Sequence, residues 1–303
     1  IGITGSIGKT SAKESIAAVL GQRVKVFRSP GNFNNEVGLP LSLLDCPEDA
    51  EIIVLEMGGA YAFGELTLLA EIARPDIGVV TNIHPVHLER MGSIENIAKT
   101  KTELVEAIPE DGFVVLNHDD DRVRAMRGAS RAPVITYGID GPADVYAHDV
   151  QSQGLKGVTF WVRINGKERY LTVPFIGSPG IYIAIVALAV GHGLGMDVAE
   201  MQEGLQDEKT QVRLLLVEGP NGSKLIDDTY NASTPSVLAA LNLLKELPAK
   251  RRIAVLGEMR ELGEEAEGAH RIIGGRAGEM VDTLVTFGEL TDITIEAAQE
   301  SAA

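Results

Sequence analysis

The sequence predicts an α/β protein with a mainly parallel sheet and an added β-hairpin region, followed by a partial α/β domain of the Rossmann type. Short runs of apolar and β-branched residues alternate with helical patterns along most of the chain. The runs are apolar throughout, which indicates strands buried on both faces and joined by helices. The first run ends in a glycine-rich turn followed by helix formers, "GITGSIGKTSAKE" at 2–14. Together these observations favour a doubly covered parallel sheet.

The first half of the chain contains the sheet elements. Further predicted strands lie at 23–27, 51–57, 76–83, 112–117 and 132–138, and predicted helices lie near 9–21, 36–45, 63–73, 93–108 and 119–127. From 143 to 175 the pattern changes to alternating residues, with Asn165 and Gly166 as a type I′ turn signal. We therefore expect a hairpin attached to the sheet.

A second α/β alternation begins after residue 210. A helical pair at 181–194 and 197–206 precedes it, and a Pro-Asn-Gly-Ser turn then joins two predicted strands. Helix 235–247, strand 251–257, helix 264–279 and strand 283–288 follow. We expect two domains, 1–209 and 210–303. Because the chain starts inside a predicted strand and stops after a helix, we expect a fragment whose second domain is incomplete.

Composition limits the classes of partner. The 303 residues are 45% hydrophobic and carry a net charge of −16, which argues against nucleic acid or an anionic membrane as a partner. A small anionic ligand remains compatible, because a local loop of backbone N–H groups and one lysine can hold it. Cys46 is the one cysteine, no signal peptide is visible, and the apolar stretch at 181–190 is too short to span a bilayer. We expect a cytoplasmic protein.

The glycine-rich turn predicts a nucleotide phosphate site. The usual pattern is Gly, four residues, then Gly-Lys-Ser/Thr, and here Ile3 occupies the first glycine position. Lys9 is expected to reach the outer phosphates and Thr10 to offer its hydroxyl to Mg²⁺. The alternative is a strand–helix turn that is rich in glycine for packing alone.

Other polar residues near strand ends remain ambiguous from chemistry alone. Glu56 suits a Mg²⁺ ligand or a helix cap, and His87 competes with His84. Three further groups of charged residues have solvated surface charge as the alternative to a functional role. They are Lys99 with Lys101, Asp227 with Asp228, and Arg213. These residues predict a Mg²⁺–nucleotide site and leave the acceptor unnamed.

Several long motifs resemble the Mur ligases, ATP-dependent amide-forming enzymes of peptidoglycan synthesis. The opening "TGSIGKT" resembles the family's TG-[ST]-x-GK-[ST] loop, which accounts for Ile3. The other stretches are "GNFNNEVGLPLSLL" (31–44), "EMGG…GEL" (56–66), "TNIHPVHLERMGSIENIAKTKTEL" (81–104), "DDTYNAS" (227–233) and "VLGEMRELGEEAEGAH" (255–270). They are most similar to the branch that joins D-alanyl-D-alanine to UDP-N-acetylmuramoyl-tripeptide, so the resemblance implies these two substrates.

The resemblance also implies site roles. Lys9 matches the phosphate-binding lysine, Thr10 and Glu56 match ligands of a first Mg²⁺, and His87, rather than His84, matches a ligand of a second Mg²⁺. Lys101 matches a lysine that many members carry as a carbamate, an anionic oxygen ligand. The expected nucleotide contacts are Thr4, Gly5, Ser6, Gly8, Lys9, Thr10 and Ser11, with Arg213 at ATP and Asp228 at the ribose; the expected substrate contacts are Asn34, Asn35, Tyr230 and Asn231.

One stretch departs from the family pattern. The adenine-binding segment G-x-H-N-x-x-N-A is replaced by "GSPGIYIA" at 177–184, with Pro179, Gly180 and Ile183 in the His and Asn positions. Three interpretations follow: the ligase named above, another Mur-type or folylpolyglutamate synthetase-like ligase, or a catalytically degenerate nucleotide-binding paralogue. The implied mechanism is ATP-driven formation of an acyl phosphate, and we expect a monomer.

Overall fold

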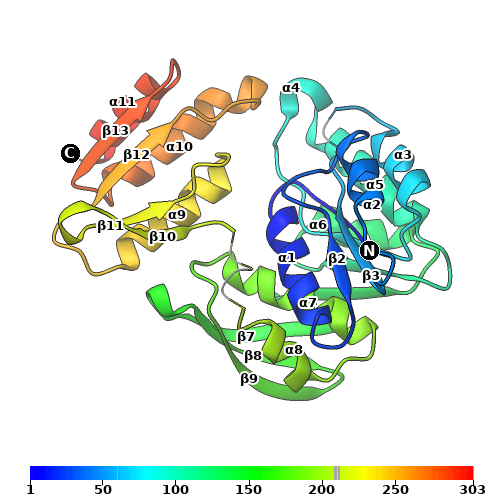
Figure 1. The fold of residues 1–303 in the computed structure, drawn as a ribbon. Coiled ribbons are helices and arrows are strands. Elements are labelled where there is room, and N and C mark those ends of the chain that lie inside the picture. The colour runs from blue at the N-terminus through cyan, green and yellow to red at the C-terminus, as the bar shows by residue number, and fades with distance from the viewer. Residues whose placement is uncertain (60, 208–209, 211, 303) are drawn as a thin grey trace.

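The first part of the chain forms one sheet of nine strands. The computed structural model describes residues 1–59, 61–207, 210 and 212–302 (Figure 1). The strands of this sheet are β1 (Gly2–Thr4), β2 (Val26–Arg28), β3 (Ile52–Glu56), β4 (Ile77–Val80), β5 (Phe113–Asn117), β6 (Val134–Gly138), β7 (Val145–Ser152), β8 (Val158–Ile164) and β9 (Lys167–Val173). Their spatial order is β2-β3-β1-β4-β5-β6-β7-β8-β9.

The sheet is parallel except at one edge. The pairs from β2 to β7 are parallel, whereas β7 with β8 and β8 with β9 are antiparallel. The β8–β9 hairpin turns at Asn165 and Gly166, whose φ angles of 51° and 73° are those of a type I′ turn. The predicted parallel sheet with an appended hairpin is confirmed.

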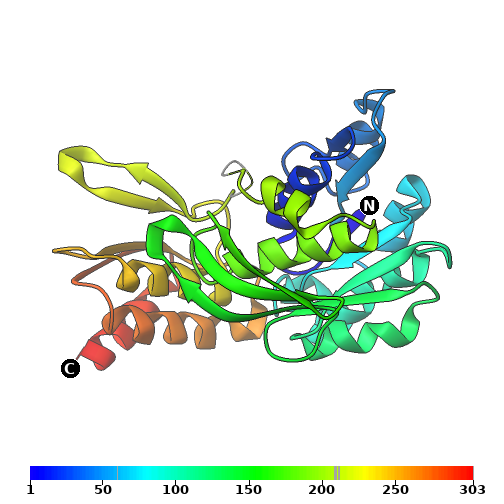
Figure 2. The ribbon, with the colours of Figure 1, turned by 90° about the horizontal axis from the view of Figure 1, so that it is seen from below.

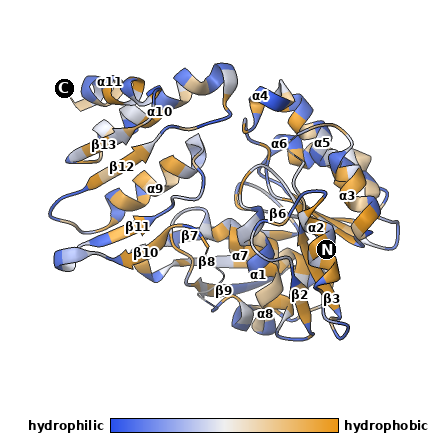
Figure 3. Cartoon of the chain, turned by 45° about the horizontal axis from the view of Figure 1, so that its top comes forward, coloured by the Kyte–Doolittle hydropathy of each residue, from blue (hydrophilic) through white to orange (hydrophobic). Residues whose placement is uncertain are grey.

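Helices cover both faces of this sheet. The helices are α1 (Lys9–Leu20), α2 (Gly38–Leu44), α3 (Glu65–Ala73), α4 (Leu88–Met91), α5 (Ile94–Ala107), α6 (Asp121–Ala125), α7 (Gly180–Gly193) and α8 (Val198–Gly204). One core lies under α1, α7 and α8, and a second lies under α2, α3, α5 and α6. Figure 3 shows apolar residues along β2 and β3; the last three residues of β3 are buried, whereas β2 forms an edge of the sheet and is only partly buried. α7 is apolar on most sides because it packs against α1, α8 and strands β5 to β8.

The second part of the chain forms two small sheets. β10 (Leu215–Glu218) and β11 (Lys224–Asp227) make an antiparallel hairpin, which extends away from the neighbouring helices in Figure 2. β12 (Ile253–Gly257) and β13 (Thr283–Phe287) are parallel. α9 (Thr234–Glu246), α10 (Ala266–Gly278) and α11 (Thr291–Ala302) accompany them, and α9, α10 and β12 share a core. Short 3₁₀ turns occur at Met126–Ala129, Gly154–Lys156, Pro220–Gly222 and Gly263–Glu265.

Local hydrogen bonds explain where the structure departs from the expected elements. β2 begins at Val26 rather than at 23, because the amides of Arg23 and Val24 still bond to Leu20 O at the end of α1 (3.0 and 3.1 Å). The boundary expected near 210 lies beside residues 208, 209 and 211, outside the described residues, and we keep it as a proposal. Within the described part of the chain, no helix has the length and apolar character of a membrane span.

Candidate active site

The carboxyl ends of three neighbouring parallel strands meet at one edge of the large sheet. β3, β1 and β4 are adjacent in that order. The glycine-rich turn follows β1, Glu56 ends β3, and the segment that leads to His87 follows β4. Parallel strands end on the same side, which is where ligands bind in open α/β sheets. The topology therefore gathers residues that are far apart in the sequence.

The glycine-rich loop is held in shape by the segment after β4. Gly5 and Gly8 have φ angles of 138° and 85°, and a Cβ on Gly5 would lie 2.0 Å from Thr81 Oγ1. The amide of Ile7 donates to Asn82 Oδ1, and Asn82 Nδ2 donates back to Ile7 O (both 2.9 Å). The amide of Ser6 bonds to Asn82 O (2.9 Å). The loop is thus preformed, and glycine is required where it passes closest to its neighbour.

Lys9 lies across the mouth of this loop. Its Nζ donates to Gly5 O (2.9 Å) and to Ser6 O (3.3 Å). Burial lowers the pKa of Lys9, the nearby Glu56 carboxylate opposes that shift, and the Arg213 guanidinium adds to it. The ammonium is therefore placed where a phosphate would replace two weak carbonyl contacts with a charged partner.

Glu56 is held between two elements. Thr10 Oγ1 donates to its Oε2 and Asn34 Nδ2 donates to its Oε1, each over 2.8 Å. The Glu56 residue is only 2% exposed, and its own amide donates to Ser29 Oγ (3.2 Å). The buried carboxylate, the threonine hydroxyl and the asparagine amide thus form one part-buried polar cluster beside Lys9.

Lys101 is a buried lysine on α5. Its Nζ donates to Gly58 O (2.5 Å) and Gly59 O (2.7 Å), and the residue is 3% exposed. Burial, followed by the positive charge of Lys9, moves the pKa of Lys101 well below its ordinary value. The neutral amine is therefore more populated here than in an ordinary exposed lysine.

His87 occupies the left-handed position before α4, with a φ of 57°. Its Nδ1 contacts the carboxylate of Glu261, a residue with a φ of 63° in the second part of the chain. Burial lowers the pKa of His87, and the Glu261 contact opposes this. His84 contributes its backbone instead: its amide donates to Ser6 Oγ (2.9 Å), which donates back to His84 O (3.1 Å).

Arg213 and Tyr230 approach from the second part of the chain. The Arg213 guanidinium carbon lies 3.9 Å from the centre of the Tyr230 ring, a cation–π contact. Asn32 Nδ2 donates to Tyr230 Oη over 2.5 Å. Burial raises the pKa of Asp228, although Arg213 and an N–H from Leu214 oppose the shift. These residues bring the second part next to the Asn32–Asn34 segment.

Some of the expected contact residues bond locally instead. Asn35 Oδ1 accepts from the amides of Val37 (3.2 Å) and Gly38 (2.8 Å), at the start of α2. Asn231 Oδ1 accepts from the next amide, that of Ala232 (2.9 Å). Thr4 Oγ1 donates to Gly58 O (3.1 Å), and Thr4 and Ser11 are both buried. Their contacts with nucleotide or substrate stay predictions.

Two family models match this chain. Residues 3–191 match the Mur ligase middle domain, and residues 212–303 match the Mur ligase glutamate ligase domain. The chain belongs to the Mur ligase family.

Individual Mur ligases support the same conclusion. The chain is 38% identical over 301 residues to the UDP-N-acetylmuramoyl-tripeptide–D-alanyl-D-alanine ligase of Bacillus subtilis, covering 98% of this chain and 64% of that protein. It is 30% identical over 293 residues to the ligase of the same name from Escherichia coli, covering 95% and 64%. The chain therefore spans somewhat less than two thirds of these relatives.

Solved Mur ligase structures share the fold. A crystal structure of MurF from Acinetobacter baumannii superposes with a TM-score of 0.90 at 26% identity, covering 98% of this chain and 65% of that one. The MurF ligase of Thermotoga maritima in complex with ADP gives a TM-score of 0.80 at 26% identity, covering 99% and 78%. The α/β architecture predicted from the sequence is confirmed by both.

The polar cluster of this Mur ligase chain fits Mg²⁺ in its donor chemistry. The Glu56 carboxylate and Thr10 hydroxyl are neighbouring oxygen donors, the type that Mg²⁺ prefers. In the ranges that the structure describes, no three side chains of His, Cys, Asp or Glu converge into a preformed cage. This agrees with a cation held by one or two protein oxygens together with phosphate and water.

The segment 177–184, which departs from the family's adenine-binding pattern, is tightly packed at Gly180. Gly180 starts α7 against Phe175, so that a Cβ at Gly180 would lie 2.8 Å from Phe175 O. An asparagine therefore does not fit at this position without movement of the backbone. Tyr182 Oη donates to Asp119 Oδ2 (2.9 Å), and burial raises the pKa of the Tyr182 phenol above its ordinary value.

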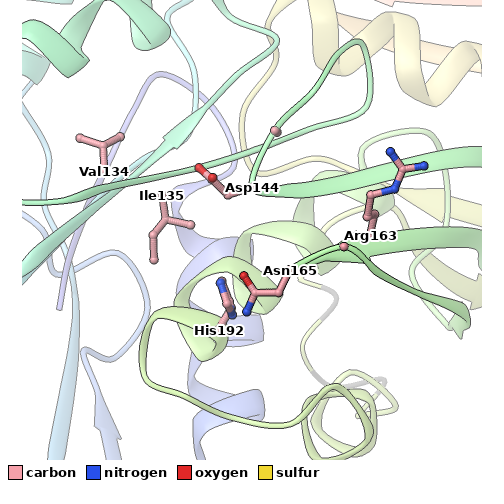
Figure 4. A pocket seen from close by; sticks show the side chains of 8 residues that line it. Val134, Ile135, Asp144, Arg163, Asn165 and His192 are labelled. Atoms are coloured by element: carbon pink, nitrogen blue, oxygen red, sulfur yellow. The ribbon is translucent and has the colours of Figure 1, made fainter.

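Two cavities in the described part of the chain lie outside this cluster. One, of about 300 Å³, opens between β6, the β8–β9 turn and the end of α7, where Asp144, Asn165 and His192 face the same space (Figure 4). The other, of about 390 Å³, is lined by residues 26–31 and Glu14. Neither is lined by a residue that the sequence predicted for the site.

The structure brings to the candidate site several residues that the sequence motifs do not single out. Asn82 and Thr81 hydrogen-bond to Ile7 of the loop. Ser29 accepts from the amide of Glu56, and Lys13 donates to the carbonyl of Ser29. Glu261 contacts His87. Asn82 lies within the family motif at 81–104, which is a usable signal. Lys13 sits one helical turn beyond Lys9, but sequence alone does not distinguish a buried lysine from a solvated one.

Proposed function

We propose that this chain carries the nucleotide-binding and catalytic residues of an ATP-dependent ligase that adds D-alanyl-D-alanine to UDP-N-acetylmuramoyl-tripeptide. The observation that carries the proposal is the convergence of Lys9, Thr10 and Glu56 with the buried Lys101 at one sheet edge. The 38% identity to a ligase of that name over almost the whole chain supports the choice of substrates. ATP and a UDP-linked precursor are intracellular metabolites, so we propose that the protein acts in the cytoplasm.

The proposed reaction has two chemical steps. A carboxylate oxygen of the tripeptide attacks the γ-phosphorus, the bond to the β-phosphate oxygen breaks, and ADP leaves. The amine of D-alanyl-D-alanine then attacks the acyl carbon, loses a proton, and phosphate departs. Mg²⁺, when bound, neutralises charge on the phosphate oxygens. We propose that Thr10 and Glu56 hold one such ion and that His87 and a carbamylated Lys101 hold a second.

The residues of the chain supply charge and exclude water. Lys9 is preorganised over the loop, so that little reorganisation is needed when charge builds up on the transferred phosphoryl group. Arg213 enters from the second part of the chain, and the Asn32–Tyr230 contact supports the docked position of that part. Such closure excludes water from an acyl phosphate, which would otherwise hydrolyse.

Phosphate release tests the proposal. We expect the protein expressed from its complete gene to release phosphate only when ATP, UDP-N-acetylmuramoyl-tripeptide and D-alanyl-D-alanine are all present. Mass spectrometry of the product then checks that the amide has formed. Release with glutamate in place of the dipeptide would instead assign a folylpolyglutamate synthetase-like or other Mur-type acceptor.

A degenerate nucleotide-binding protein is the second candidate. The observation that favours it is the altered 177–184 segment, where Phe175 leaves no room for an asparagine at Gly180. Against it stands the intact cluster around Glu56. If calorimetry shows that the protein binds ATP but no acceptor leads to phosphate release, that result would support this candidate and contradict the proposed ligase function.

A further inference from the structure

Lys13 is a fully buried lysine that the proposed function leaves without a role. It lies on α1 one turn beyond Lys9 and Thr10, at the i+4 and i+3 positions, and therefore on the same helix face. Its exposed fraction is 0%. Lysines are rarely buried to this extent unless the charge is paired and hydrogen-bonded, because removing an ammonium from water is costly. The contacts of the Lys13 ammonium should therefore reveal its purpose.

The three donors of that ammonium all have acceptors. Lys13 Nζ lies 2.6 Å from Ser29 O, 2.7 Å from Gly31 O and 3.2 Å from Glu14 Oε1. Glu14 is also paired with Arg28, whose Nε lies 2.5 Å from Glu14 Oε2. Two backbone carbonyls of one connection are thus tied to the helix that carries the phosphate-binding lysine.

The segment held in this way runs from Ser29 to Asn35 and joins β2 to α2. Most of its residues are exposed, and the internal bond from the amide of Phe33 to Pro30 O is 3.2 Å long. Its ends nevertheless reach the candidate site. Ser29 Oγ accepts from the amide of Glu56, and the side chain of Asn34 donates to the Glu56 carboxylate.

The same segment contacts the second part of the chain. Asn32 Nδ2 donates to Tyr230 Oη over 2.5 Å, and the Tyr230 ring lies against the Arg213 guanidinium. Asn34 O accepts from the amide of Gly58 (2.7 Å), next to the carbonyls that hold Lys101. The largely exposed segment 29–35 therefore hydrogen-bonds to Glu56, Tyr230 and Gly58. The buried Lys13 ammonium holds the first part of this segment through the carbonyls of Ser29 and Gly31.

We propose that Lys13 is a positioning residue that fixes the segment 29–35, so that Asn34 meets Glu56 and Asn32 meets Tyr230. Its ammonium acts on the backbone of this segment and touches neither nucleotide nor acceptor. The catalytic consequence rests on the proposed ligase function, whereas the positioning itself is a property of the chain without substrates.

The first test is amide hydrogen exchange of the chain without ligands. In Lys13→Met, which keeps the side-chain length and removes the donors, peptides covering 30–37 should exchange at least about tenfold faster. Peptides covering 2–12 should change by less than about twofold, because the loop is held by Asn82. Lys13→Arg, which restores charged donors, should recover part of the protection. Equal exchange at 30–37 in wild type and Lys13→Met would overturn the proposal.

A matched control and a milder variant keep this test decisive. Lys25→Met removes an exposed lysine that lies directly before β2 and is paired with Asp49, and it should leave exchange at 30–37 unchanged. If Lys13→Met does not fold by circular dichroism, Lys13→Gln keeps one donor group on a shorter arm. It should give the same pattern with smaller amplitude, and unchanged exchange at 30–37 again contradicts the proposal.

The second test separates positioning from phosphate binding. In the ligase assay, Lys13→Met should lower kcat by about tenfold or more while the Kd for ATP changes by less than about threefold. A Kd for ATP that rises as much as kcat falls would mean that Lys13 acts through the phosphate loop, which overturns the proposal. If the wild-type protein releases no phosphate, the proposed function fails, and the exchange experiment still decides the role of Lys13.

Discussion

Thr10 Oγ1 donates to Glu56 Oε2 over 2.8 Å and so joins the first turn of α1 to the end of β3. The pair places a part-buried hydroxyl next to a buried carboxylate, and both are potential Mg²⁺ ligands. We therefore expect Glu56→Gln, which keeps the shape and removes the charge, to abolish most of the Mg²⁺ dependence of ATP affinity. Calorimetry with and without Mg²⁺ measures this, and Glu71→Gln on the exposed face of α3 is the matched control. A variant that keeps the wild-type Mg²⁺ dependence contradicts the assignment.

Lys9→Ala removes the charged donor at the mouth of the phosphate loop. The loss of one preorganised donor costs about 3–4 kcal/mol of transition-state stabilisation, which corresponds to about 10²–10³ in kcat. The affinity for ATP should also fall, because the ammonium is already positioned at Gly5 O and Ser6 O in the absence of nucleotide. Equal ATP affinity in wild type and Lys9→Ala would contradict the proposal that Lys9 binds the phosphates of ATP.

Lys101 should form a carbamate in bicarbonate at neutral pH. Only the neutral amine adds CO₂, and burial together with Lys9 lowers the pKa of Lys101, so that the amine is available at lower pH than in an ordinary lysine. As the pH falls through the lowered pKa, the ammonium forms and the carbamate should disappear. Lys9→Met removes the second cause of the shift and should move this loss to higher pH. ¹³C NMR with labelled bicarbonate measures the adduct.

Lys99 provides the control for the carbamate. It lies two residues before Lys101 on α5 and is exposed, so Lys99→Ala should leave the ¹³C signal and the turnover nearly unchanged. Loss of the signal in Lys99→Ala, or its persistence in Lys101→Ala, would place the carbamate elsewhere.

Glu261, in the second part of the chain, should support the metal-binding role that we propose for His87. With Nδ1 of His87 occupied by the Glu261 carboxylate, Nε2 is the ring nitrogen left for a cation. Removal of such an outer partner typically weakens metal affinity by about 10–100-fold. Glu261→Ala should therefore raise the Mg²⁺ concentration needed for half-maximal activity by that factor. Glu264→Ala serves as a nearby carboxylate control, and equal Mg²⁺ dependence in Glu261→Ala and wild type would be the contrary result.

Discrimination between ATP and GTP should be weak. A site rejects an analogue strongly only when its buried polar groups would be left unpaired, and Pro179, Gly180 and Ile183 offer no such side-chain groups. We expect the preference for ATP over GTP to be below about tenfold in competition binding. Ile183→Asn should tighten ATP by about 1 kcal/mol if one hydrogen bond is restored. Gly180→Asn should not, because its Cβ would meet Phe175 O. A preference for ATP over GTP of about a hundredfold or more in wild type would mean that other groups of the protein recognise the adenine base.

Patterns within single segments predicted a large part of the fold and of the site. Apolar runs separated by helical patterns predicted the parallel sheet, and Asn165-Gly166 predicted the β8–β9 turn, because both signals depend on neighbours in the sequence. The Gly-Lys-Thr turn predicted Lys9 and Thr10 for the same reason. Family motifs added Glu56, His87 and Lys101.

Tertiary structure decided what those residues bond to. Asn35 lies in the same motif as Asn34, yet Asn35 accepts from the amides of Val37 and Gly38 whereas Asn34 donates to Glu56. The difference depends on where β3 lies relative to the 29–35 segment. Lys13 reads as an ordinary helix lysine, and only the packing of that segment against α1 buries it. Glu261 and His87 are 174 residues apart and meet because the second part of the chain packs against the first. The sequence by itself determined which chemical groups the chain carries and in which order its helices and strands follow one another. Long-range packing decided which groups are buried and paired, because burial and hydrogen-bond partners depend on segments that local patterns do not describe.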